Sequence, residues 1–60
     1  MKLYDVPKES FIRYADIFEL YFCHIDGMYS LCYDSSNQPV HLVAWTDVEL
    51  LEHKPENWND

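Results

Sequence analysis

The dipeptide Asp26-Gly27 is the sequence feature that most constrains the fold of this chain. It stands between two runs that are rich in aromatic and β-branched residues, 19–25 (ELYFCHI) and 28–33 (MYSLCY). A type I′ turn needs positive φ at both central residues, and Asp-Gly between strand-like runs is a strong signal for it. The sequence therefore predicts a two-residue hairpin, with these pairs across it: Ile25 with Met28, Cys23 with Ser30, and Tyr21 with Cys32.

A second hairpin is predicted around Asn37, which suits the left-handed position that closes a type I turn with a bulge. A three-residue loop over 35–37 pairs Cys32 with Val40 and Ser30 with Leu42. Pro39 lacks an N–H and belongs at a strand start or an edge. The third strand of a meander is accordingly expected over 40–45, with shorter strands at 11–14 and 48–51. The stretch 15–18 is read either as a turn or as a single helical turn.

Side chains alternate between the two faces of a strand, so this register sorts the meander into two faces. The uncharged face, with smaller side chains, is predicted to be the core: Tyr21, Cys23, Ile25, Met28, Ser30, Cys32, Val40, Leu42 and Ala44. The other face is more aromatic and carries polar tips: Leu20, Phe22, His24, Tyr29, Leu31, Tyr33, His41, Val43 and Trp45.

These strands predict an all-β fold, a small SH3-like barrel of about five short antiparallel strands. A curled sheet limits the exposed edges of so short a chain. We expect one β-barrel domain over 1–52 and an acidic C-terminal tail over 53–60. Sixty residues bury only a small core. Met1, followed at once by sequence of this kind, suggests a complete, unprocessed, soluble chain.

Charge excludes one class of partner. Eleven acidic residues face four basic ones, for a net charge of −7, and from residue 14 onward the only Lys or Arg is Lys54. Nucleic-acid binders derive most of their affinity from Lys and Arg on phosphates, so direct binding of DNA or RNA is not expected. No run is long and apolar enough for a membrane span.

The sequence resembles a group of small, mostly uncharacterised proteins of tailed bacteriophages. The likeness covers residues 4–51 through the strings DVPKESF, ELYFCHIDGMYSLCYD and PVHLVAWTDVELL. It is carried by these residues: Val6, Pro7, Phe11, Tyr21, Ile25, Asp26, Gly27, Tyr29, Val40, Ala44, Val48 and Glu49. The resemblance implies a phage origin, a small β-barrel and the cytoplasm of a host cell. It implies no established activity, but small acidic phage proteins often bind and divert a host protein.

Catalytic, metal and disulfide chemistry is not expected. The cysteines and histidines lack zinc-site spacing, and the register puts His24 and His41 on the order of 12 Å apart. Cys23 and Cys32 are diagonal neighbours at roughly 7–8 Å, too far for a disulfide, so both are predicted to be free thiols. Cys23 and His24 point to opposite faces of a strand. We expect no enzyme and no cofactor.

The aromatic face then becomes the candidate contact surface, because such a patch rimmed by charge is typical of protein interfaces. The sequence predicts a non-enzymatic phage accessory protein that binds a host protein and inhibits or redirects it. The expected contact residues, with their acidic rim, are Phe22, His24, Tyr29, Tyr33, His41, Trp45, Asp47, Glu49, Glu52 and Glu56.

Four alternatives remain open for this face and its acidic rim. The first is an acidic nucleic-acid mimic, and the second is a homodimer through the same face. The third is an aromatic cage for a methylated amine. In the last, the face is a second core, covered by Tyr4, Phe18, Leu51 or Trp58.

Overall fold

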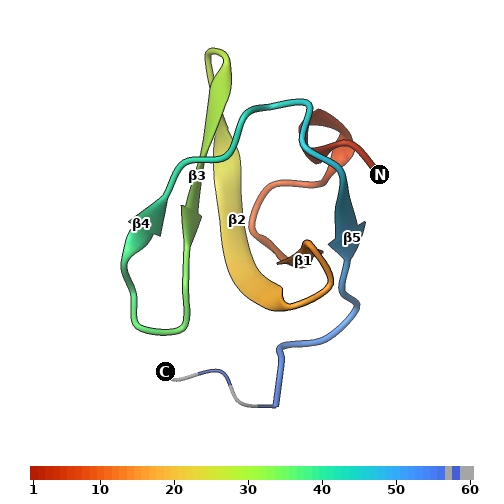
Figure 1. Ribbon diagram of the computed structural model, residues 1–60, viewed down its shortest axis with the longest axis vertical. Coiled ribbons are helices and arrows are strands. Elements are labelled where there is room, and N and C mark those ends of the chain that lie inside the picture. Colours follow the sequence, from red (N-terminus) through yellow and green to blue (C-terminus); the bar gives the residue numbers. More distant parts are fainter. Residues whose placement is uncertain (57, 59–60) are drawn as a thin grey trace.

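Within residues 1–56 and 58, which the computed structural model describes, the chain forms one open sheet of five antiparallel strands (Figure 1). A single 3-10 turn precedes them, η1 (Leu3–Asp5). The strands are β1 (Ser10–Tyr14), β2 (Phe18–Asp26), β3 (Tyr29–Tyr33), β4 (Pro39–Val40) and β5 (Val48–Leu50). The predicted all-β fold of about five short strands is confirmed.

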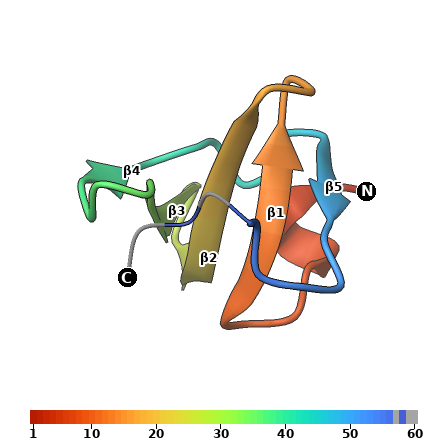
Figure 2. The same cartoon turned by 90° about the horizontal axis from the view of Figure 1, so that it is seen from below.

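The strands lie in the order β4-β3-β2-β1-β5, so the meander is extended by β5 pairing with β1. Seen from below, the strands follow one another around a common interior (Figure 2). Each backbone is antiparallel to its neighbours. The sheet is curled like that of a small SH3-like barrel and stays open between its edge strands β4 and β5.

The turn between β3 and β4 has the predicted form. Asn37 adopts φ 64, and its N–H donates to the Asp34 carbonyl at 2.9 Å. The Asp34 carboxylate accepts two further backbone N–H groups of the loop, each at 2.9 Å. Cys32 pairs with Val40, so the register predicted for this hairpin is confirmed. Pro39 begins the edge strand, where no ladder bond is needed from it.

The turn between β2 and β3 lies one residue later than predicted. Asp26 pairs with Tyr29, which makes Gly27 and Met28 the central residues. Gly27 has φ 66 while Met28 keeps a negative φ, the pattern of a type II′ turn with glycine first. This change slides the pairing by two residues, so Ile25 and Ser30 keep their predicted face, but Met28 leaves the strand for the turn and is exposed.

A β-bulge at Cys23 is what moves side chains to the other face. The register shifts between Phe22 and His24, and the Cys23 carbonyl accepts the N–H of Glu9 at 3.2 Å. Upstream of the bulge, Phe22 therefore shares a face with Cys32. Phe22 is 1% exposed, so its predicted place on the outer face is wrong.

The core lies inside the curl and draws on every part of the chain. Its buried cluster consists of Leu3, Val6, Ile12, Leu20, Phe22, Cys32 and Val48. Ile25, Val40 and Leu42 are partly buried against it, so the predicted shared face of these three with Cys32 is confirmed. Tyr21 and Cys23 were predicted in the core but are only half-buried, because the bulge turns Leu20 and Phe22 inward instead.

The N-terminus covers one side of this core by pairing with the segment before β5. The amides of Leu3 and Tyr4 donate to the carbonyls of Thr46 and Ala44 at 2.9 and 3.0 Å. At the other end of the molecule, the tail returns to the sheet, and Trp58 packs edge-on against Phe11 with ring centroids 5.0 Å apart.

A turn connects β1 to β2. This confirms the first of the two predictions for residues 15–18, a turn, over the second, a single helical turn. Ala15 and Asp16 have φ values of 54 and 63, and Ile17 donates its N–H to the Tyr14 carbonyl at 3.3 Å. Positive φ at both central residues is the mark of a type I′ turn, here built without glycine.

Candidate binding surfaces

Large apolar side chains gather at the end of the molecule that carries the β2–β3 hairpin. Backbone bonds bring three segments together there: Tyr4 donates to Ala44, and Ala44 donates to the Met28 carbonyl at 2.8 Å. Tyr29 forms a β-bridge with Val43. Figure 1 shows η1, the hairpin and the β4–β5 connection meeting at this end. We name the exposed side chains of these segments the tip surface: Tyr4, Met28, Tyr29 and Trp45.

These four side chains keep half or more of their surface in solvent. The exposed fractions are 56% for Tyr4, 63% for Met28, and 52% each for Tyr29 and Trp45. The backbones of Tyr4, Met28 and Tyr29 take part in the pairing just described, and Trp45 directly follows Ala44, which is bonded to both other segments. Tyr, Trp and Met are residue types enriched in the centres of protein interfaces.

Acidic side chains border the tip surface. Asp26 pairs with Tyr29 across the hairpin, and Asp5 follows Tyr4 in η1; both are exposed. Asp47 stands two residues after Trp45 and pairs with the Lys2 ammonium at 3.0 Å. The tip surface is therefore apolar at its centre, with Asp5 and Asp26 as negative charges at its margin, while the charge of Asp47 is matched by Lys2.

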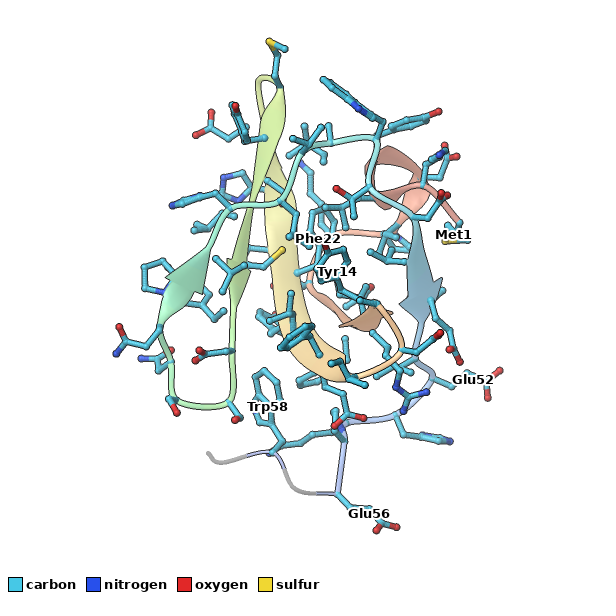
Figure 3. The ribbon with its side chains drawn as sticks, in the orientation of Figure 1. Met1, Tyr14, Phe22, Glu52, Glu56 and Trp58 are labelled. Atoms are coloured by element: carbon cyan, nitrogen blue, oxygen red, sulfur yellow. The ribbon has the colours of Figure 1, made fainter. Side chains whose placement is uncertain are left out.

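The structure separates the contact residues that the sequence had placed on one face. Phe22 lies in the interior, within the buried cluster against which Tyr14 packs (Figure 3). Tyr33 is half-buried and lies four positions from Tyr29 on the same strand, about 13 Å along it. Tyr29 and Trp45 alone of the predicted aromatic residues belong to the tip surface. An aromatic cage of Phe22, Tyr29, Tyr33 and Trp45 does not form.

The two predicted histidines are exposed but differ in their contacts. His24 pairs with Leu31 across β2 and β3. The His41 ring reaches back to the strand, where Nδ1 lies 3.0 Å from the Ser30 carbonyl oxygen. For Nδ1 to donate this bond it must carry the proton. His41 thus takes part in holding the edge of the sheet.

The predicted acidic rim is also divided between two ends. Glu49 lies 3.5 Å from Arg13, whose other nitrogen bonds Glu19 at 2.9 Å. The hydrogen bond that Arg13 donates to Glu19 is the main reason that the pKa of Arg13 is raised. Glu52 and Glu56 are exposed near the tail, away from the hairpin (Figure 3). Of the four predicted acids, Asp47 alone borders the tip surface.

Neither thiol has the environment of a reactive cysteine. Cys32 is buried and Cys23 is half-buried. Burial raises the pKa of both, the nearby Glu9 carboxylate adds to the rise at Cys23, and the hydrogen bond from Ser30 partly offsets it at Cys32. A raised pKa disfavours the thiolate, which is the nucleophile and the metal ligand. Among the described residues, no three His, Cys, Asp or Glu side chains converge as a metal site.

Sequence reasoning missed Tyr4 and Met28. Met28 was assigned to the core, but it occupies the second central position of a turn and is exposed. The signal was available, since glycine favours the first central position of a type II′ turn. Tyr4 reaches the tip surface only because η1 pairs with a segment forty residues away, and nothing local indicates that.

Comparisons with known proteins return no match among protein-family models, curated proteins or solved structures. The resemblance to tailed-phage proteins therefore stays a prediction. In the described part of the chain, no helix is long and apolar enough to cross a membrane.

Proposed function

We propose that this chain is a non-enzymatic binding module that engages a basic surface of another protein through the tip surface. In the finer form that the sequence resemblance suggests, it is a phage accessory protein that inhibits or redirects a host protein. The observation that carries the proposal is the exposure of four large side chains on three mutually bonded segments.

The exposed side chains of the tip surface represent a large share of the stability that a chain of this size can have. Burying a large apolar side chain contributes roughly 1.5–3 kcal/mol, and a chain of this length has a free energy of unfolding of only about 3–9 kcal/mol. Leaving Tyr29 and Trp45 half-exposed therefore forgoes stability that folding could have used. A partner that covers them recovers this free energy, and Asp5, Asp26 and the chain's charge of −7 favour a basic partner.

The test is a comparison of three proteins as bait in host lysate, followed by affinity measurements with the purified partner. The first is the wild type, and the second carries Tyr29→Ala and Trp45→Ala. The matched control carries Ile17→Ala and Leu50→Ala, which remove exposed apolar side chains outside the tip surface. We expect the tip variant to keep its melting temperature and lose at least about 2 kcal/mol of binding, roughly 25-fold in Kd.

Four results would contradict the proposal. Equal binding by all three proteins would remove the tip surface from the interface. Unfolding of the tip variant would make these residues a second core. A dimer that the tip variant dissociates would assign the surface to a second copy. Affinity that falls steeply with salt, with no effect of the tip variant, would favour an acidic nucleic-acid mimic.

A further inference from the structure

An apolar groove opens at the end of the molecule opposite the tip surface, between edge strand β4 and the β1–β2 hairpin. Its lining is almost wholly apolar, with one carboxylate: Tyr14, Phe18, Leu20, Val40, Leu42 and Asp34. Tyr14, Val40 and Leu42 also pack against the core, so the floor of the groove is continuous with the protein interior. Phe18 stands at the rim, 52% exposed, with its ring stacked on Tyr14.

The groove exists because the sheet does not close on this side. Strand β4 ends at Val40, and beyond it the pairing with β3 is kept by the Ser30 N–H, which donates to the Leu42 carbonyl at 2.8 Å, and by the bridge between Tyr29 and Val43. The N–H of Leu42 bonds the Ser30 hydroxyl at 3.2 Å, and His41 Nδ1 takes the position at the Ser30 carbonyl that a ladder amide would have. These bonds anchor the wall formed by Val40 and Leu42.

The charged side chains around the groove determine which kind of peptide segment can bind in it. Asp34 is held in place by the two loop amides that its Oδ1 accepts. An adjoining depression is lined by Asp34 and by Glu19, but the Glu19 carboxylate is paired with Arg13 at 2.9 Å, so Asp34 is the carboxylate that gives the groove its charge. Among the described residues that line the groove there is no Lys or Arg, and Asp16 is exposed in the turn that leads to Phe18. An apolar side chain that enters the groove thus has negative charge beside it.

We propose that this groove is a second docking site, and that its occupant is a protein segment presenting a large aliphatic side chain beside a lysine or arginine. The aliphatic side chain inserts between Val40 and Phe18, and the cation lies next to Asp34. A second copy of this chain is a poorer occupant, because it brings a further charge of −7 to a negative rim.

The experiment is an NMR titration of the isotope-labelled protein with three blocked hexapeptides. The probe has the sequence Lys-Val-Leu-Lys-Val-Lys. One control peptide replaces each lysine with glutamate, and the other replaces leucine and both valines with alanine. We expect the probe alone to shift the amide signals of the groove residues, with a Kd in the millimolar range or below.

Matched variants locate the site. Phe18→Ser and Tyr29→Ser replace aromatic side chains of equal exposure, 52%, at opposite ends of the molecule. We expect Phe18→Ser to weaken the probe at least tenfold and Tyr29→Ser to leave it unchanged. Asp34→Asn keeps an oxygen for the two loop amides but removes the charge, so it is expected to weaken binding severalfold and flatten the salt dependence. The dispersion of the spectrum reports whether each variant is folded.

The proposal is overturned if no groove signal moves at several millimolar probe, or if the glutamate peptide binds equally well. It is also overturned if the shifts cluster at Tyr29 and Trp45, or if groove signals depend on protein concentration without peptide, which would indicate self-association. Loss of probe binding in Phe18→Ser alone says nothing against the tip surface, so the two proposals fail separately.

Discussion

Replacing Ser30 with alanine tests how the curled sheet is held together. Ser30 is completely buried, and its hydroxyl oxygen lies 3.0 Å from the Leu42 carbonyl, 3.2 Å from the Leu42 amide nitrogen and 3.4 Å from the Cys32 sulfur. The Ser30 backbone N–H keeps a ladder bond to the Leu42 carbonyl at 2.8 Å, but the Ser30 hydroxyl replaces the Ser30 carbonyl as the acceptor for the Leu42 N–H. Ser30→Ala removes the hydrogen bonds of the hydroxyl while leaving the backbone bond and the packing nearly unchanged.

The expected cost follows from the Leu42 N–H. An unsatisfied buried donor costs about 1–3 kcal/mol, and because Leu42 is only half-buried we take a middle value of about 2 kcal/mol. A chain of this length has a free energy of unfolding of roughly 3–9 kcal/mol, from about 0.05–0.15 kcal/mol per residue. A loss of 2 kcal/mol lowers Tm by roughly 8–16 °C in a domain of this size.

The assay is urea and thermal unfolding followed by circular dichroism, with Ser36→Ala as the control. Ser36 is exposed in the β3–β4 loop, and its substitution is expected to stay within about 0.5 kcal/mol of the wild type. If Ser30→Ala costs no more than Ser36→Ala, the Leu42 amide has found the Ser30 carbonyl instead. The side-chain account of this edge, and of the groove wall that depends on it, is then refuted.

Three further predictions address the core, the turns and the thiols. Phe22→Ala is expected to cost about 3–5 kcal/mol and to leave the chain largely unfolded by circular dichroism at 37 °C. Tyr29→Ala is expected to keep its Tm. The reverse result would support the register without a bulge, in which Phe22 lies on the outer face. Ala15→Gly is expected to raise stability by up to about 1 kcal/mol in urea titrations, because Ala15 has positive φ, which glycine adopts more readily. Gly27→Ala is expected to lower stability by about 1 kcal/mol. A Cβ at Gly27 meets no atom within 4 Å, so this loss comes from the positive φ alone. The two substitutions are expected to change the free energy of unfolding in opposite directions. A stabilising Gly27→Ala would contradict this prediction. Because burial raises the pKa of Cys23 and Cys32, the unfolded thiols ionise first, so the contribution of these two thiols to stability is constant below pH of about 8.5 and falls above it. Urea midpoints at rising pH measure this fall, and intact mass without reductant, together with a zinc assay, is expected to show two free thiols and no metal.

Residues close in sequence determined the turns, and through them most of the fold. Asn37 takes the left-handed conformation because its side chain tolerates it, and this sets the loop that pairs Cys32 with Val40. Gly27 determines the other hairpin because it lacks a Cβ and adopts positive φ readily, even though the turn begins one residue later than Asp-Gly alone suggests. Such choices depend on the φ preferences of the turn residues themselves, so the sequence carries them without any knowledge of the rest of the chain.

The tertiary structure decided which side of β2 faces the core. The bulge at Cys23 is fixed by the N–H of Glu9, fourteen residues away, and by the burial of Leu20 and Phe22 against Leu3 and Val6. A trace of this was present in the sequence, since apolar residues at 20, 22 and 25 break the period of two. Strict alternation cannot show where the extra residue lies, because the partner that bonds it comes from another segment.

Long-range pairing also explains why the residues of the predicted aromatic face lie in different parts of the structure. Alternation along a strand places side chains on a side of the sheet, but it does not say how far the sheet curls or which segments meet at its ends. Tyr4 joins Trp45 and Met28 only through η1 pairing with the β4–β5 connection, and Glu52 and Glu56 end beside the tail instead. Local sequence thus determined the strands and turns. Long-range hydrogen bonds and burial decided which side chains remain at the surface to meet a partner.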